Sequence, residues 1–390
     1  MVLGWFPLNT TGFTHLEQLA PATHLRVDAR GTVTRTREDV VSQWVHPPRI
    51  PLDDCLEMAR DSLLRHLRAA SPLWERATVG LSGGYDSRAV VSSLRKAGVS
   101  FDAYVKGNTE SRDVAIASRL AAIAGRELTV DRDSELPSPD AIDLKRSIEL
   151  SLLWQAGLLD TAKHKTFFAA GRRLAPGVVR LMGQHGEIGR RFFHPRNARI
   201  TKMMASPAGA RIDFSPLLID EVMQAAPAYL RSEVRQRAHD LIGQALRQAA
   251  PHRLSTAAAL DFFYLYERTR RLNGGSLSSQ TNQVITPFLN PDYIRAVFAS
   301  ALHDRDAEAF HRFIVEMNAP DWAQVPYESH NSPYYDSLDY WRSVGAPLVE
   351  ELLARDGFWL DVCDGDRARA EWMQAPDELA ILCMTDVTRP

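Results

Sequence analysis

Cysteine is scarce in this sequence. Its 390 residues include three cysteines, Cys55, Cys363 and Cys383, which are far apart and odd in number. Neither a CxxC pair nor an HExxH motif is present. These absences exclude a disulfide framework and argue against a structural zinc site. We therefore expect reduced, buried thiols in a cytoplasmic protein.

Long apolar runs and a strong net charge are also lacking. No apolar run reaches the roughly 18 residues that a membrane-spanning helix needs. The N-terminal stretch MVLGWFPLNTTGFTH has no basic region followed by an apolar core, so we expect no signal peptide. The formal net charge of −2 gives no overall attraction to nucleic acid or to a membrane, and we expect neither as a partner.

The composition is that of a globular protein, because 45% of the residues are hydrophobic. Short apolar strands are predicted at residues 77–81, 100–107, 127–130 and 176–183. Helices at residues 87–98 and 112–125 separate the first three strands. This alternation predicts an α/β fold with a doubly wound parallel sheet. From about residue 208 to the end, the pattern predicts a large helical part without further strands.

The N-terminal region reads differently from the rest. Residues 1–50 predict short strands and turns, with Gly31 at a turn. A proline-rich break at residues 46–54 then marks a boundary, and Asp53 or Asp54 is expected to cap the helix that follows. We therefore divide the chain into a small β-rich part, residues 1–50, and a main domain, residues 51–390.

A glycine-rich loop, GLSGGYDSRA at residues 80–89, follows the first strand and precedes a helix. Glycine lets backbone N–H groups crowd around an anion, and a helix N-terminus adds a partial positive charge. Serine hydroxyls add further donors. We therefore expect a phosphate to bind at this edge of the sheet, held by Leu81, Ser82, Gly83, Gly84 and Ser87.

Asp86 is unusual in this loop, because a carboxylate repels phosphate. Its presence makes sense if Mg²⁺ bridges the carboxylate and the phosphate oxygens. The loop is neither a GxxxxGK[ST] phosphate loop nor a GxGxxG dinucleotide fingerprint, because both spacings are absent.

The SGGYDS stretch resembles the SGGxDS motif of the PP-loop ATP pyrophosphatases, which cleave ATP between the α and β phosphates. Two further stretches resemble the synthetase domain of asparagine synthetase and its relatives, the β-lactam and carbapenam synthetases and the lasso-peptide cyclases. These are VVRLMGQHGEIG at 178–189 and NQVITPFLNPDYIRAVFA at 282–299. The resemblance runs from about residue 50 to about residue 335 and implies a PP-loop fold with ATP and Mg²⁺ as cofactors.

The resemblance also assigns residues. In the family, the second strand helps to hold adenosine, which implies Val105, Lys106 and Gly107, and the second loop begins with a glycine, here Gly183. An acidic residue of that loop joins the SGGxDS aspartate on Mg²⁺, which implies Asp86 and Glu187 as the metal ligands. Gln184 stands where the family has a glutamate or a catalytic tyrosine, and His185 beside it is a candidate general base.

Two family features are missing. Residues 10–44 resemble the tail that links the family's glutaminase domain to its synthetase domain, but Val2 stands where the glutaminase has its cysteine, so we expect no glutamine hydrolysis by this chain. The nitrogen would then come from ammonia, a partner glutaminase or an amine on the substrate. The family's C-terminal lysine is also absent from VPYESHNSPYY at 325–335.

Either an arginine replaces that lysine, or the chemistry differs, or the activity is lost. Arg270 and Arg271 are candidates, as are Arg190 and Arg191 after the second loop. The basic cluster that continues from Arg190 to Lys202 offers an alternative role, in binding an acidic substrate or a partner. Trp154 and Gln155 are either core residues or part of the carboxylate pocket.

These features predict an ATP-dependent carbon–nitrogen ligase. It would adenylate a substrate carboxylate, release pyrophosphate, and couple the acyl group to an amine or ammonia, in natural-product or peptide modification. Two alternatives stay open. One is a catalytically drifted, nucleotide-binding scaffold subunit with a protein partner, and the other is a different PP-loop chemistry such as tRNA modification.

Overall fold

The computed structural model of the chain describes residues 7–11, 15–39, 41–107, 111–131, 177–190, 192–193, 206, 213, 215–224, 226–271, 283–301, 308–328, 346–357 and 359–372.

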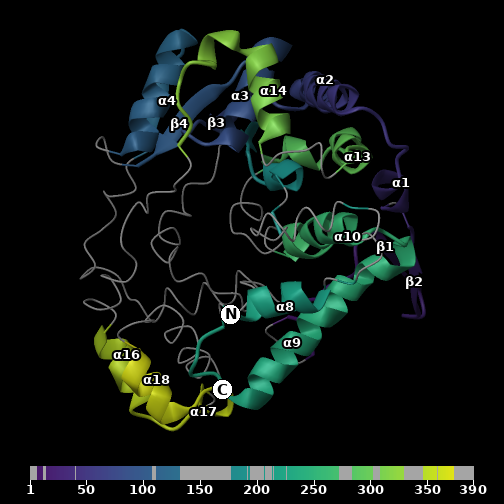
Figure 1. Cartoon of the computed structure of the whole chain (residues 1–390), viewed down its shortest axis with the longest axis vertical. Coiled ribbons are helices and arrows are strands. Elements are labelled where there is room, and N and C mark those ends of the chain that lie inside the picture. The colour runs from purple at the N-terminus through teal and green to yellow at the C-terminus, as the bar shows by residue number, and fades with distance from the viewer. Residues whose placement is uncertain are drawn as a thin grey trace.

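A five-stranded, all-parallel sheet forms the centre of the fold (Figure 1). Its spatial order is β5-β4-β3-β6-β7. The strands are β3 (Arg76–Gly80), β4 (Asp102–Lys106), β5 (Leu128–Asp131), β6 (Val178–Leu181) and β7 (Gln283–Ile285). The predicted α/β fold with a parallel sheet is therefore confirmed.

Two crossover helices join the first three strands. Helix α3 (Tyr85–Ala97) ends at Gly98, whose φ of 72° closes the helix in the left-handed conformation, as predicted. Helix α4 (Arg112–Ile123) begins at Ser111, whose side chain accepts a hydrogen bond from the Val114 N–H. The apolar faces of both helices are buried in the main core.

The strand order reverses beside β3. From β3 the chain moves outward through β4 to β5, and it then returns to place β6 on the other side of β3. The carboxyl ends of β3 and β6 therefore flank a topological switch point, which is where open α/β sheets bind ligands. The glycine loop follows β3 and the second predicted loop follows β6.

Helices from the second half of the chain complete the core. Helix α14 (Ala309–Asn318) packs against α3, and α13 (Pro291–Ala299) packs against α2 (Leu52–Ala70). Figure 1 shows these four helices gathered at one end of the molecule. The remaining described helices of eight residues or more are α8 (Ser215–Gln224), α9 (Ser232–Leu246), α10 (Thr256–Phe263) and α16 (Ala346–Leu353).

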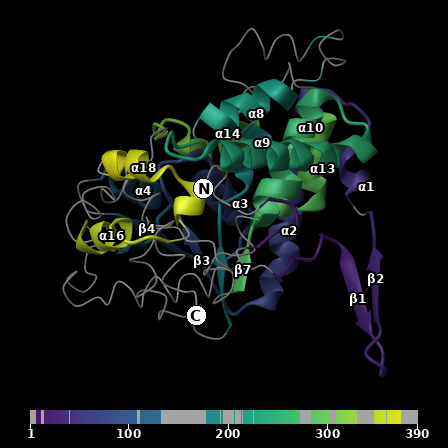
Figure 2. The same ribbon diagram turned by 90° about the horizontal axis from the view of Figure 1, so that it is seen from below.

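The N-terminal region contains an antiparallel hairpin, β1 (Thr23–Val27) and β2 (Val33–Arg37), as predicted. Gly31 lies at its turn with a φ of 80°. Figure 2 shows the hairpin projecting from the main body. Arg37 at its end donates a hydrogen bond to the Tyr266 hydroxyl.

Two details of the prediction are wrong. Strand β7 lies in a region predicted to be helical, because Gln283–Ile285 is too short to show an alternating pattern. Helix α2 begins at Leu52 with Pro51 as its N-cap residue, so Asp53 and Asp54 lie in its first turn and do not cap it. There they still face the positive end of the helix dipole.

The cysteine prediction is confirmed where it can be checked. Cys55 and Cys363 are buried, and neither forms a disulfide bond. Burial raises the pKa of Cys363 to about 12, so this thiol is protonated and unreactive. Cys383 lies outside the described residues. Within the described part of the chain, no helix combines the length and the apolar character needed to cross a membrane.

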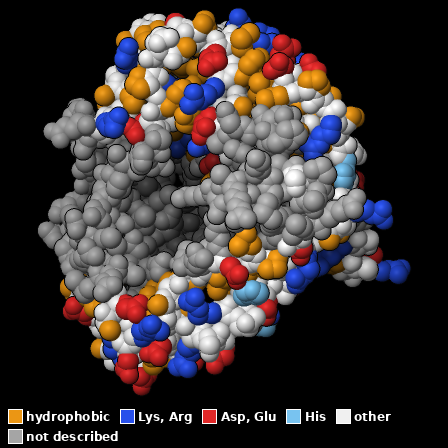
Figure 3. All heavy atoms as spheres, in the orientation of Figure 1, with side chains coloured by type: hydrophobic (Ala, Val, Ile, Leu, Met, Phe, Trp, Pro, Cys, Tyr) orange, Lys and Arg blue, Asp and Glu red, His pale blue; other side chains and the backbone are white. Residues whose placement is uncertain are grey.

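Acidic and basic side chains are mixed over the described part of the face in Figure 3. This distribution matches the formal net charge of −2.

Candidate functional site

The glycine loop between β3 and α3 is held by its own serines. The Ser82 N–H donates to the Ser87 Oγ at 3.1 Å, and the two hydroxyl oxygens are 2.8 Å apart. The Gly84 N–H donates to the Ser82 Oγ at 3.2 Å. Gly84 is the N-cap of α3 and offers no side-chain acceptor, so the first-turn N–H groups of α3 carry the partial positive charge that binds anions.

The second loop packs directly against the first. A Cβ atom on Gly183 would lie 2.9 Å from the Asp86 carbonyl carbon and 2.9 Å from the Ser87 N, which is closer than real Cβ atoms come. A Cβ atom on Gly186 would collide with the Asp86 Oδ1. Glycine is therefore required at Gly183, where the close atoms belong to the backbone, whereas a side chain at Gly186 would displace the Asp86 carboxylate. The residues expected from the two loops do lie together in the fold.

Both carboxylate oxygens of Asp86 face nitrogen atoms. Oδ1 lies 2.8 Å from the His311 Nε2, and Oδ2 accepts a hydrogen bond from the Arg190 Nη1 at 3.2 Å. His311 is fully buried and comes from α14, whereas Arg190 ends the short 3₁₀ helix η5 (Gly186–Arg190) of the second loop. His311 is a site residue that the sequence prediction missed.

Glu187 is held by a tyrosine. The Tyr264 hydroxyl donates to the Glu187 Oε2 at 2.7 Å. Tyr264 begins a π-helical stretch, η8 (Tyr264–Thr269), which follows α10. Burial, Glu187 and Asp86 all raise the pKa of Tyr264, so it stays a protonated donor. Both predicted metal-binding carboxylates therefore act on the same hydroxyl group.

His185 is buried and has a φ of 74°, a conformation that non-glycine residues rarely adopt. Burial and Arg268 lower its pKa to about 4. The imidazole is therefore neutral at pH 7, but its pKa is far below the near-neutral value that suits a general base. The adjacent Gln184 is exposed. The catalytic roles of both residues stay predictions.

Arg270 and Arg271 face the N-terminal segment. The Arg270 Nη2 donates to the Leu8 carbonyl at 3.0 Å, and the Arg271 Nη2 donates to the Asn9 Oδ1 at 3.3 Å. Burial and the neighbouring Arg270 lower the pKa of Arg271 to about 10. This geometry does not support either arginine as the replacement for the missing lysine.

Arg268, which the sequence prediction did not name, lies beside the second loop instead. It lowers the pKa of His185, and its guanidinium carbon lies 5.3 Å from the centre of the Tyr264 ring. Arg268 lies within the π-helical stretch, whose wider turn changes which side chains share a face. Arg190 and Arg268 are therefore described arginines that lie at the second loop.

The end of β4 adjoins the glycine loop. The Leu81 N–H donates to the Tyr104 carbonyl at 2.8 Å, and the Val105 side chain is buried in the main core. Gly107 has a φ of 143° and donates to the Asp131 carbonyl at 3.2 Å. Lys106 ends the strand and is half-buried. The three residues predicted for adenosine thus lie on the strand next to β3. Trp154, Gln155, Arg191 and the basic cluster after it lie outside the described residues.

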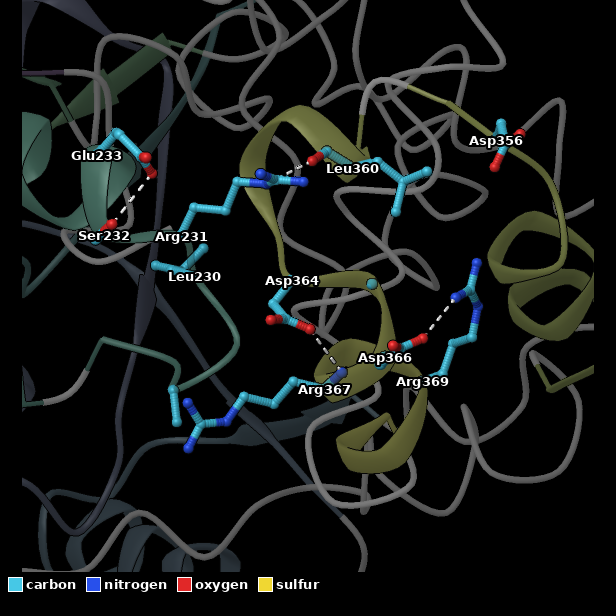
Figure 4. A pocket seen from close by; sticks show the side chains of 12 residues that line it. Leu230, Arg231, Ser232, Glu233, Asp356, Leu360, Asp364, Asp366, Arg367 and Arg369 are labelled. Carbon is cyan, nitrogen blue, oxygen red and sulfur yellow. Dashed lines mark hydrogen bonds and ion pairs between the residues drawn. The ribbon is translucent and has the colours of Figure 1, made fainter.

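A polar pocket of 560 Å³ lies elsewhere, at the opposite end of the molecule from α3 (Figures 1 and 4). It lies between the start of α9 and the short helices α17 (Trp359–Val362) and α18 (Gly365–Glu371). Two of its arginines have partners within the wall, since the Arg231 Nε donates to the Leu360 carbonyl at 2.7 Å and Arg369 pairs with Asp366. No sequence prediction pointed to it.

The paired loops combine a helix N-terminus with two carboxylates. Gly183 packs on the backbone of Asp86 and Ser87, and the first turn of α3 begins beside this contact. Within the described residues, no three His, Cys, Asp or Glu side chains are grouped to hold a metal ion. Mg²⁺ commonly uses one or two carboxylates together with substrate phosphates, so Asp86 and Glu187 fit it once Asp86 exchanges a nitrogen partner for the ion.

No protein-family model matches this chain, and a search of curated proteins found no match. The assignment of the site therefore depends on the two loops and their contacts.

Proposed function

We propose that this chain is an ATP-dependent carbon–nitrogen ligase of the PP-loop type. The observation that carries the proposal is the contact between the two loops at the switch point, where Gly183 packs on the backbone of Asp86 and Ser87. An SGGYDS loop, the N-terminus of α3 and the carboxylates of Asp86 and Glu187 lie at this edge of the sheet, and they support the proposal because the resemblance to asparagine synthetase-like enzymes expects this combination.

The reaction has two steps. A substrate carboxylate attacks the α-phosphorus of ATP and forms an acyl-adenylate, with pyrophosphate as the leaving group. An amine or ammonia then attacks the acyl carbon, forms the amide bond and expels AMP. Mg²⁺ bound to Asp86 and Glu187 would neutralise charge on the phosphates.

The chain's own residues have separate tasks in this proposal. The first-turn N–H groups of α3 bind phosphate oxygens. Arg190 and Arg268 supply the positive charge that the family takes from its C-terminal lysine, because both lie beside the second loop. Tyr264 fixes the orientation of Glu187 through its hydroxyl group.

ATP–pyrophosphate exchange tests the adenylation step. Purified protein is incubated with ATP, labelled pyrophosphate, Mg²⁺ and a panel of amino acids, β-amino acids and peptides. We expect exchange with at least one carboxylate and its loss in Asp86→Asn. Exchange that is equal in wild type and Asp86→Asn would refute the proposal.

A nucleotide-binding scaffold is the second candidate. Three observations favour it: Asp86 already pairs with His311 and Arg190, the pKa of His185 is too low for a base, and Gln184 cannot take a proton. This candidate predicts nucleotide binding without exchange for any carboxylate. A tRNA-modifying chemistry has less support, because the sequence has three widely separated cysteines and no catalytic pair.

A further inference from the structure

The segment Val325–Glu328 lies across the glycine loop, although the two are far apart in the sequence. The Glu328 N–H donates to the Gly83 carbonyl at 2.9 Å. The Tyr327 ring stacks on the ring of Tyr85, with centroids 4.1 Å apart and planes 10° from parallel. We call residues 325–328 the strap.

A buried arginine of α3 anchors the first half of the strap. The Arg88 Nη1 donates to the Val325 carbonyl at 2.8 Å, and its Nη2 donates to the Pro326 carbonyl. Its guanidinium carbon also lies 4.1 Å from the centre of the Tyr327 ring. Arg88 is fully buried, so these contacts compensate a charge that would otherwise be costly to desolvate. Tyr85, at the variable position of the SGGxDS motif, and Arg88, directly after the motif, therefore both contact the strap.

The strap ends in an ion pair with α4. The Glu328 Oε2 lies 3.0 Å from the Arg112 Nε, and the Glu328 side chain is only 8% exposed. Asp113, which follows Arg112 in α4, accepts a hydrogen bond from the Gly83 N–H at 2.8 Å. Gly83 is therefore held from both sides, with its N–H bound by α4 and its carbonyl bound by the strap.

The fit around Gly83 leaves no space for a side chain. A Cβ atom there would lie 2.7 Å from the Glu328 Cβ and 2.8 Å from the Asp113 Oδ1. Because both peptide groups that flank Gly83 have fixed partners, the strap determines the direction in which the loop presents its remaining N–H groups. Preorganised donors bind an anion without the cost of ordering the loop.

We propose that the strap sets the conformation of the glycine loop and that Arg112 and Glu328 are positioning residues for nucleotide binding. The stretch in which the family resemblance expects a lysine therefore contributes a carboxylate that acts on the loop through Arg112. The part of the proposal that concerns nucleotide affinity rests on the proposed function, whereas the part that concerns loop order does not.

Four variants test the proposal. Glu328→Gln and Arg112→Gln each remove the ion pair, and the double variant R112E/E328R restores it with the charges exchanged. Asp321→Asn is the matched control, because Asp321 pairs with Arg95 of α3 at 3.0 Å, away from the loop. Each protein is measured by hydrogen exchange of peptides covering residues 80–88, by titration with a fluorescent ATP analogue and Mg²⁺, and by thermal unfolding.

We expect Glu328→Gln and Arg112→Gln to speed amide exchange at residues 80–88 by roughly three- to tenfold and to weaken nucleotide binding by a similar factor. The charge-exchanged double variant should recover at least half of each loss. Asp321→Asn should leave exchange at 80–88 and nucleotide affinity unchanged. We also expect every variant to keep a melting temperature close to that of wild type. Changes in loop exchange could then be attributed to the loop and not to a loss of global stability.

Two outcomes have distinct meanings. If wild type binds no nucleotide but Glu328→Gln and Arg112→Gln still speed amide exchange at residues 80–88, the strap proposal is supported and the proposed function is refuted. If wild type binds nucleotide but Glu328→Gln and Arg112→Gln change neither exchange nor affinity more than Asp321→Asn does, the strap proposal is overturned.

Discussion

The Asp86 Oδ1 lies 2.8 Å from the Nε2 of His311, a fully buried side chain on helix α14, which is distant from Asp86 in the sequence. The carboxylate expected to work beside phosphate is thus fixed by the packing of α14 on α3. The same helix leads into the strap that crosses the glycine loop. Two separate contacts therefore make the loop depend on the C-terminal helical part.

Replacing His311 should separate the effect of its nitrogen beside Asp86 from its packing role. His311→Gln keeps a nitrogen near this position, whereas His311→Leu keeps apolar volume and leaves Asp86 with Arg190 alone. A change of about 1.4 kcal/mol in the surroundings of the Asp86 carboxylate corresponds to a factor of ten, so we expect His311→Leu to slow ATP–pyrophosphate exchange by roughly tenfold. His311→Gln should retain most of the rate. Equal rates in the two variants would show that His311 serves packing only.

A methyl group on Gly183 should destabilise the protein. Its Cβ would lie 2.9 Å from backbone atoms of Asp86 and Ser87, which cannot move as a flexible side chain can. Overpacking of this kind costs about 1–3 kcal/mol, so Gly183→Ala should lower the urea midpoint and weaken nucleotide binding.

Gly80→Ala is the matched control for Gly183→Ala. Its Cβ would meet the Tyr104 ring at 3.7 Å, which is ordinary contact, so its urea midpoint should change less. A larger loss in Gly80→Ala than in Gly183→Ala would contradict the close approach of the two loops.

The Tyr264–Glu187 pair should act as a unit. Tyr264→Phe and Glu187→Gln each weaken the same 2.7 Å hydrogen bond, because burial and both carboxylates keep the phenol protonated. We expect each single variant to raise the Mg²⁺ concentration needed for half-maximal exchange. The double variant should be little worse than the poorer single variant, since the contact is lost only once. Additive effects would mean that the two residues act separately.

The sequence predicted the loops better than their surroundings. The glycine loop was placed correctly because Gly83 and Gly84 mark the turn between an apolar strand and a helix. The second loop was found through its resemblance to a known pattern, and the fold brings Gly183 against Asp86. Strand β7 was missed because three residues show no periodicity.

Contacts between distant segments could not be read from local patterns. His311 lies in a stripe of buried side chains on α14 with Phe310, Ile314 and Val315, and a histidine in an apolar stripe was the available signal. Arg268 was not named beside Arg270 and Arg271, and its position at the second loop depends on the π-helical path of η8. The strap offered no signal at all, since its partners lie in the glycine loop, α3 and α4.

The last prediction concerns pH. Burial and Arg268 lower the folded-state pKa of His185 to about 4, whereas an unfolded histidine titrates near about 6.5. Between these values the unfolded chain binds more protons than the folded chain, so the His185 contribution makes stability fall as pH decreases from about 6.5 towards 4. One pKa unit corresponds to about 1.4 kcal/mol, so the full contribution is on the order of 3 kcal/mol.

His185→Asn removes this titration and suits the positive φ of 74°, because asparagine adopts that conformation more readily than most residues. We expect wild type to lose more stability than the variant when the pH is lowered from 7 to 5, as measured by urea unfolding at both values. His66 and His252, whose pKa values burial also lowers, are present in both proteins and cancel in the comparison. Parallel losses in the two proteins would mean that His185 is not the buried neutral imidazole that its position beside Arg268 requires.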